Sequence, residues 1–172
     1  QHPGIDYRGM VRALITNLRH GSLRQGGSTL TQQLAKNYFL TPTKTLTRKF
    51  KEALISVIIE LEYEKEEILE IYLNEIYLGQ KGSAAINGVG EASYFYFGKP
   101  VKRVTLVEAA TIAGLIKAPN NYSPYRDMAR SRDRRDTVLQ AMHRWEWITQ
   151  SELDEALKQP VKAVGFIASE KK

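Results

Sequence analysis

The sequence predicts a mainly α-helical protein. Apolar residues recur at three- and four-residue intervals along most of the chain, which is the spacing of one helix face. Three segments have the form of a capping box, which marks a helix N-terminus: Thr29 to Gln32, Thr105 to Glu108 and Thr149 to Glu152. No segment shows a convincing alternation of apolar and polar residues, the pattern of a half-buried strand.

The composition is typical of a globular domain, and 172 residues are enough to bury a substantial core. The chain has no cysteine, so disulfides and thiolate metal sites are excluded. The longest apolar run, Ala53 to Ile59 with Ser56 inside it, is far shorter than the ~20 residues of a membrane span. The formal net charge of +6 suits nucleic acid, an anionic membrane surface or a phosphate-bearing substrate, and does not choose among them.

Three helices are predicted in the first part of the chain. The first contains Met10 to Leu18 and ends near Gly21, and the second begins near Ser28 or Thr29. The apolar side of the second is predicted to be Leu30, Leu34 and Tyr38. The third runs from about Lys44 to Glu62. Its buried stripe is predicted to be Leu46, Phe50, Leu54, Val57, Ile58 and Leu61.

The rest of the chain predicts four more helices separated by turns. An amphipathic helix within Glu62 to Leu78 is stopped at Gly79, and Gly79 to Gly90 is predicted to be a loop without regular structure. The aromatic run Tyr94 to Phe97 is expected in the core. The later segments are an apolar helix from Thr105 through Ile116, a turn at Pro119 to Tyr122, an arginine-rich helix within Asp127 to Trp145, and a short helix from Thr149 that stops at Pro160.

Two polar clusters lie in the stretch from Gly26 to Glu52. The first follows a double glycine at a helix N-terminus, where backbone N–H groups favour an anion. Its members are Ser28, Thr29, Gln32, Gln33 and Lys36. The second is Arg48, Lys49 and Glu52, which on its own fits a surface salt bridge of ~0.3–0.5 kcal/mol. We interpret the two clusters together as a site for an anionic, sugar-bearing substrate.

Several segments, in order, resemble the motifs of one bacterial enzyme family. They are Gly27–Asn37, Arg48–Glu52 (an R-K-x-x-E motif), Lys65–Asn74 (K-x-x-I-L-E-x-Y-L-N), Tyr96–Lys99 and Pro119–Tyr122. The family is the peptidoglycan glycosyltransferases, which are the transglycosylase domains of class A penicillin-binding proteins and their monofunctional relatives. The resemblance extends to about Pro160, so residues 1–160 are expected to form this domain and 161–172 a tail or linker.

The resemblance implies a lysozyme-like helical large lobe and a small lobe that faces the membrane. The family's first motif, E-D-x-x-F-x-x-H-x-G, is present only at its end, as His2-Pro3-Gly4. The family's principal catalytic glutamate is therefore expected upstream of Gln1, and the chain as given is expected to polymerise nothing. The resemblance places the protein at the extracytoplasmic face of the bacterial cytoplasmic membrane, anchored by a segment further upstream.

The implied reaction joins lipid II units into β-1,4 glycan strands, with inversion and release of polyprenyl diphosphate. Cationic side chains suit the diphosphate leaving group. The substrate-binding residues implied by the resemblance are His2, Ser28, Thr29, Gln32, Gln33, Lys36, Arg48, Lys49, Asn120 and Arg134. Glu52 is implied as the second acidic residue of the site. Three roles stay open for it: orienting the cations, holding a divalent Mg or Mn ion on the diphosphate, or assisting protonation.

The partners implied by the resemblance are lipid II, the growing glycan strand, an anionic membrane surface and moenomycin-type inhibitors. One alternative is a basic helical nucleic-acid-binding module that uses Arg126 to Arg135. It is disfavoured, and no nucleic-acid partner is expected, because the polar clusters mix amides and carboxylates with the cations. Further alternatives are a lytic, glycan-cleaving enzyme of related fold and a non-catalytic interaction domain.

Overall fold

The computed structural model describes residues 30–39 and 45–164, and the prediction of a mainly helical protein is confirmed for them. The chain divides into two compact units, Gln1–Leu73 and Asn74–Lys172, and each is described by itself. The predicted helix at Met10 to Leu18 and the predicted cap at Thr29 lie outside the described residues. None of the described helices is both long and apolar enough to cross a membrane.

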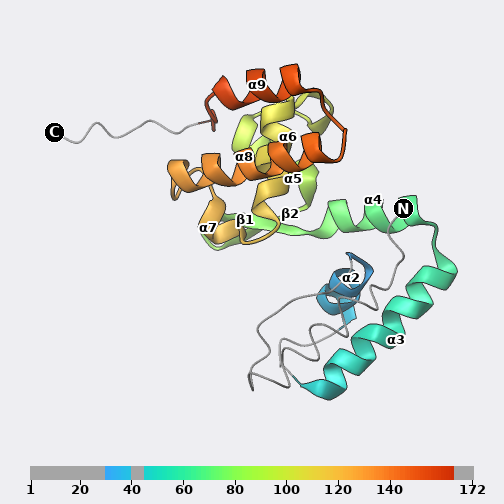
Figure 1. Cartoon of the computed structure of the whole chain (residues 1–172). Coiled ribbons are helices and arrows are strands. Elements are labelled where there is room, and N and C mark those ends of the chain that lie inside the picture. Colours follow the sequence, from blue (N-terminus) through green and yellow to red (C-terminus); the bar gives the residue numbers. More distant parts are fainter. Residues whose placement is uncertain (1–29, 40–44, 165–172) are drawn as a thin grey trace, which may run out of the picture. The chain divides into compact units, whose positions relative to one another are not determined.

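The first unit contains three described helices: α2 (Leu30–Phe39), α3 (Leu46–Glu62) and α4 (Lys65–Glu75), whose last two residues belong to the second unit (Figure 1). Thr45 starts α3, because its side chain accepts a hydrogen bond from the Arg48 N–H at 3.1 Å. The core of this unit joins the three helices through Leu34, Ala35, Ile59 and Ile68.

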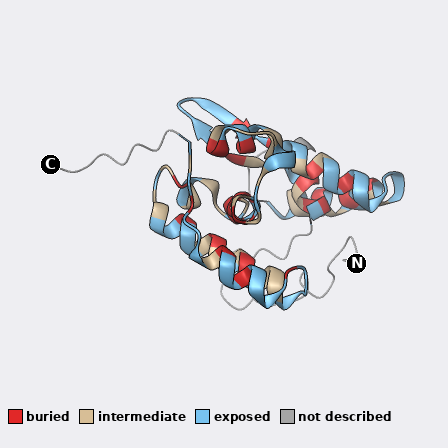
Figure 2. Cartoon of the chain, turned by 90° about the horizontal axis from the view of Figure 1, so that it is seen from above, coloured by how far each residue is buried: buried red, intermediate tan, exposed pale blue. Residues whose placement is uncertain are grey.

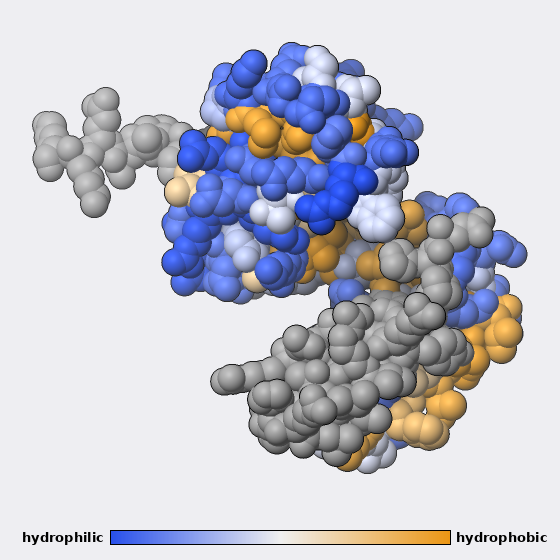
Figure 3. Space-filling model, viewed as in Figure 1, coloured by the Kyte–Doolittle hydropathy of each residue, from blue (hydrophilic) through white to orange (hydrophobic). Residues whose placement is uncertain are grey.

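The prediction of a buried apolar stripe on α3 is wrong. Leu46, Phe50 and Leu61 are 78%, 66% and 79% exposed, and Leu54, Val57 and Ile58 are exposed as well. The buried residues of α3 are instead Glu52, Ser56 and Ile59 (Figure 2). Orange, apolar side chains accordingly line the surface along α3 in Figure 3. The spacing correctly predicted an amphipathic helix. In the structure, however, α3 packs its more polar side against α2, and the apolar side is exposed to solvent.

The second unit begins with an antiparallel hairpin of β1 (Tyr77–Lys81) and β2 (Ala84–Asn87). The predictions of no strand, and of a loop without regular structure from Gly79 to Gly90, are therefore wrong. The preceding helix ends at Glu75 rather than continuing to Leu78. Such short strands give too few residues for an alternating pattern, and their buried residues are Leu78, Gly79 and Ile86.

Helix α5 (Gly88–Phe97) follows the hairpin directly, and its first residue has to be glycine. Gly88 has φ +76°, and a Cβ atom there would lie 2.2 Å from the main-chain oxygen of Asn74. Of the aromatic run expected in the core, Tyr96 and Phe97 are buried, whereas Tyr94 is 60% exposed.

The remaining elements pack into a second helical core. They are the 3₁₀ turn η1 (Val101–Arg103), α6 (Leu106–Leu115), α7 (Pro119–Tyr122), α8 (Met128–Arg144) and α9 (Gln150–Lys158). The capping boxes predicted at Thr105 and Thr149 are both formed. The predicted turn at Pro119 is a single turn of helix. The core joins α6, α8 and α9 through Val107, Ala110, Leu139, Ile148, Leu153 and Ala156.

Candidate active site

The first two turns of α3 bring together the cationic and acidic residues that the sequence analysis singled out. Arg48 NH1 lies 3.3 Å from Glu52 Oε2, and Lys49 Nζ donates to Glu52 Oε1. The Glu52 side chain is only 2% exposed, whereas those of Arg48 and Lys49 are 16% and 41% exposed. The site is thus a buried carboxylate that holds two cations, of which Lys49 is the more accessible.

This arrangement is not a commonplace surface salt bridge. A carboxylate that leaves water is destabilised unless it is paired and hydrogen-bonded, and Glu52 has a cation on each oxygen. Ser56, one turn later on the same face, donates its hydroxyl hydrogen to the Glu52 main-chain oxygen at 2.6 Å.

Helix α2 carries the described residues of the first cluster, Gln32, Gln33 and Lys36, and packs against α3 in the same unit. Gln32 is 1% exposed, Gln33 is half-buried and Lys36 is exposed, so the predicted shared polar face extends from the interior to the surface. The Oε1 atom of Gln33 accepts a hydrogen bond from Tyr72 of α4 at 3.3 Å. Leu34 is buried as predicted, but Leu30 is 42% exposed, against the prediction.

A carboxylate on the far half of α3 ties the three helices together. Glu60 accepts hydrogen bonds from Thr31 of α2 and from Lys65 of α4. Burial pushes the pKa of Glu60 up, but the bonds from Lys65 and Thr31 outweigh burial and hold that pKa below its ordinary value. The position of α2 on α3 is therefore fixed by an ionised group as well as by apolar packing.

The remaining predicted residues of the first unit, His2, Ser28 and Thr29, lie outside the described residues. Asn120 and Arg134 lie in the second unit, which is described by itself. Asn120 is exposed, and its Oδ1 accepts a hydrogen bond from the Tyr77 hydroxyl at 3.0 Å.

Arg134 lines a pocket of about 450 Å³ between α8 and the segment from Lys117 to Tyr122, which includes α7. The other lining residues are Lys117, Asn121, Tyr122, Arg130, Asp133 and Thr137. The pocket lining contains three cationic side chains and one carboxylate, and this excess of positive charge suits an anionic ligand. Lys117 and Arg130 were not among the predicted substrate-binding residues. The four-residue spacing of Arg130 and Arg134 on one helix was the signal that could have identified Arg130.

The helix packing places Arg134 firmly in this pocket. Its Nε atom donates to the Gly114 main-chain oxygen at 3.3 Å, and its guanidinium lies 5.8 Å from the centre of the Tyr122 ring. A Cβ atom at Gly114 would come within 3.1 Å of Arg134 Cγ, so the glycine allows α8 to approach α6 at this point.

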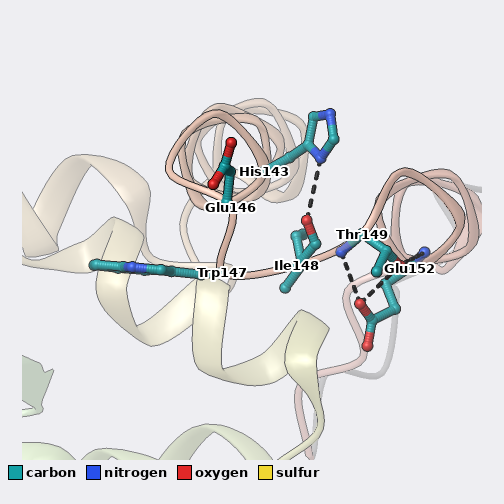
Figure 4. Close-up of a pocket in the computed structure, with 6 residues that line it drawn as sticks. All are labelled: His143, Glu146, Trp147, Ile148, Thr149 and Glu152. Carbon is teal, nitrogen blue, oxygen red and sulfur yellow. Dashed lines mark hydrogen bonds between the residues drawn. The ribbon is translucent and has the colours of Figure 1, made fainter.

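Another pocket, of about 330 Å³, lies at the turn between α8 and α9 (Figure 4). Its polar groups serve the local structure: Glu152 accepts from the Thr149 N–H at 2.8 Å, and His143 Nδ1 lies 3.1 Å from the Ile148 oxygen. Trp147 is 75% exposed and extends away from these groups in Figure 4.

The described residues do not contain a group of three or more histidine, aspartate or glutamate side chains placed to hold a metal ion. Glu52 offers one carboxylate, and both of its oxygens already accept bonds from cations. This donor set does not fit a metal cage made by the protein alone.

Comparison with known proteins identifies the family. The family model described as Transglycosylase matches residues 1–143. The chain belongs to the transglycosylase family. It is 46% identical over 161 residues to penicillin-binding protein 1B of Vibrio cholerae, which is 94% of this chain and 21% of that protein. It is 48% identical over 160 residues to penicillin-binding protein 1A of Aquifex aeolicus, which is 93% of this chain and 22% of that protein.

A solved structure agrees with this assignment. The crystal structure of penicillin-binding protein 1A from Haemophilus influenzae matches with a TM-score of 0.53 and 43% sequence identity, over 59% of this chain and 15% of that one. The transglycosylase chain thus spans about a fifth of the length of the relatives that it matches. The family places it among the hexosyltransferases, the enzymes that transfer sugar units, and the expected resemblance is confirmed.

Proposed function

We propose that this transglycosylase domain polymerises lipid II into β-1,4 glycan strands, with inversion at the anomeric carbon. The observation that carries the proposal is the buried Glu52 with Arg48 and Lys49 on its two oxygens. Two cations fixed side by side match a diphosphate, which leaves with the electron pair of the broken glycosidic bond. The 4-hydroxyl of the acceptor sugar forms the new bond at the donor's anomeric carbon.

The proton of that hydroxyl passes to a general base, which the family resemblance assigns to the glutamate of the first motif. An inverting displacement needs this base on the face of the sugar opposite the leaving group. Arg48 is suited to the diphosphate, because a guanidinium can donate two parallel hydrogen bonds to phosphate oxygens. Ser28, Thr29, Gln33 and Lys36 supply further donors in this proposal, and Asn120 and Arg134 stay predicted substrate-binding residues.

Of the roles that the sequence left open for Glu52, its contacts favour the orientation of the cations. With one cation on each oxygen, it fixes the separation and direction of the Arg48 and Lys49 head groups. A divalent Mg or Mn ion on the diphosphate stays a prediction, and no step of the proposed reaction depends on it. Loss of polymerisation on treatment with EDTA, restored by either ion, is the measurement that tests it.

We also propose that the apolar face of α3 lies in the surface of the cytoplasmic membrane, on its extracytoplasmic side. A helix with one strongly apolar face and one polar face binds in the plane of the lipid headgroup layer. Large exposed apolar patches mark interaction sites, and six apolar residues of α3 are exposed on this face. A lipid-linked substrate is presented at the same surface. Moenomycin-type phosphoglycolipids, which combine a sugar phosphate with a lipid, are expected to compete for the same site.

The polymerisation proposal is tested with purified lipid II and the longest native form of the protein, so that any residues before Gln1 are present. Gel analysis of the glycan is expected to show strands that lysozyme digests. Glu52→Gln is expected to lose at least about a hundredfold in rate, because the cations lose their charged partner. Glu62→Gln, which alters an exposed carboxylate at the end of α3, is the matched control and should keep full activity. Strand formation by Glu52→Gln at the parent rate would contradict the proposal, and solubilisation of sacculi in place of polymerisation would favour a lytic enzyme.

A further inference from the structure

Tyr72 is the tyrosine of the K-x-x-I-L-E-x-Y-L-N motif, and it contacts a predicted substrate-binding residue, but no role was predicted for it. It lies in the middle of α4, is 2% exposed, and donates its hydroxyl hydrogen to Gln33 Oε1 at 3.3 Å. Burial raises the pKa of the Tyr72 hydroxyl, so the group keeps its proton near neutral pH. Tyr72 is therefore a constant hydrogen-bond donor to one end of the Gln33 amide.

An amide side chain has an accepting oxygen at one end and a donating NH₂ group at the other. A donor held against Oε1 turns the two Nε2 hydrogens away from Tyr72. We propose that Tyr72 is a positioning residue, which fixes the Gln33 amide with its NH₂ group directed at the oxygens of the sugar diphosphate. The opposite orientation would direct an oxygen lone pair at an anionic group and oppose binding.

The backbone that carries Gln33 is held independently of Tyr72. Thr31, two residues earlier and 3% exposed, donates to Glu60, which also accepts from Lys65. Leu34 and Ala35 pack in the core against Ile59 and Ile68. Loss of the Tyr72 hydroxyl should therefore free the amide to rotate without displacing α2, and this separates a positioning role from a general structural one.

The inference rests on the proposed function, and its kinetic test uses the same lipid II assay with the longest native form. Tyr72→Phe removes one hydroxyl group and is expected to raise KM for lipid II about 3- to 10-fold with kcat within about twofold. In a Gln33→Ala background Tyr72→Phe is expected to add nothing, because the amide that it orients is gone. Tyr96→Phe is the matched control, since it removes a hydroxyl that is equally buried and bonds to the Leu78 oxygen at 2.9 Å.

Three outcomes would overturn the inference. They are an unchanged KM in Tyr72→Phe, an equal rise in the Tyr96→Phe control, and the same rise in the Gln33→Ala background. The orientation is also measurable without turnover, from the Gln33 side-chain NH₂ resonances in a ¹⁵N NMR spectrum of the chain. Tyr72→Phe is expected to shift or broaden these resonances, and Tyr96→Phe is not. A protein that makes no glycan would contradict the proposed function, whereas unshifted NH₂ resonances would contradict the role of Tyr72.

Discussion

The apolar face of α3 leads to a prediction whose magnitude follows from its exposure. Ile58 and Leu61 lie three residues apart on this face and are 58% and 79% exposed. Full burial of such a side chain contributes roughly 1.5–3 kcal/mol, so burial of the exposed fractions of the pair in lipid contributes roughly 2–4 kcal/mol. The double variant Ile58→Gln/Leu61→Gln is therefore expected to bind vesicles roughly 30- to 1,000-fold more weakly. Glutamine suits the substitution because it is a good helix former.

The assay is co-sedimentation of the protein with vesicles of mixed neutral and anionic lipid. The double variant Trp145→Gln/Trp147→Gln is the matched control, because it removes two side chains that are 69% and 75% exposed in the second unit. The control is expected to bind as the parent does, and both variants should keep the parent's circular dichroism and melting temperature. Equal loss of binding in the two variants, or unchanged binding of the α3 variant, would refute the reasoning. Binding that high salt abolishes in every variant would assign the membrane contact to the basic charge instead.

Three further predictions concern stability. Glu60 has a lowered pKa in the folded protein, so its stabilising contribution is complete above the unfolded value of about 4.5 and is lost as the pH falls through the folded value. The deficit of Glu60→Gln in free energy of unfolding should thus be constant from pH 8 to about pH 5 and shrink below that range, and denaturant titrations at several pH values measure it. Glu146 has φ +60°, so Glu146→Gly is expected to stabilise by roughly 0.5–1 kcal/mol, and an unchanged or lower melting temperature would contradict this. Gly88→Ala is expected to destabilise by roughly 2–5 kcal/mol in the same measurement, because its Cβ atom would overlap the Asn74 oxygen.

Local signals in the sequence predicted α6, α8 and α9 of the second unit, whereas α5 was not predicted as a helix. The capping boxes at Thr105 and Thr149 form as expected, because a Thr at the N-cap and a Glu three residues later satisfy each other without help from the rest of the fold. The hairpin of β1 and β2 was not predicted, and one contact that holds it is the hydrogen bond from the Tyr96 hydroxyl to the Leu78 oxygen. Long-range contacts of this kind leave no periodic pattern in the sequence.

The candidate site was predictable as a set of residue types but not as an arrangement. The spacing of Arg48, Lys49 and Glu52 predicted that they would share one face of a helix, and they do. Spacing could not reveal that this face is the buried one, since hydrophobicity argues for the opposite side of α3. The role of Tyr72 was not predicted for a similar reason, because a tyrosine in an apolar stretch is most simply a core residue until its hydroxyl partner is known.

The orientation of α3 connects the proposed diphosphate-binding site with the proposed membrane contact, because both lie on this helix. A lipid-linked sugar diphosphate is apolar at one end and charged in the middle, so a protein that binds it at a membrane surface needs an apolar and a cationic surface close together. An α-helix is only about 10–12 Å across with its side chains, so two faces of one helix meet this need without further structure. Helix α3 has Leu46 and Phe50 exposed on one side and Arg48 with Glu52 on the other, within its first two turns. A conventional amphipathic helix would have buried the apolar side against the protein and left no lipid-facing surface beside the cations.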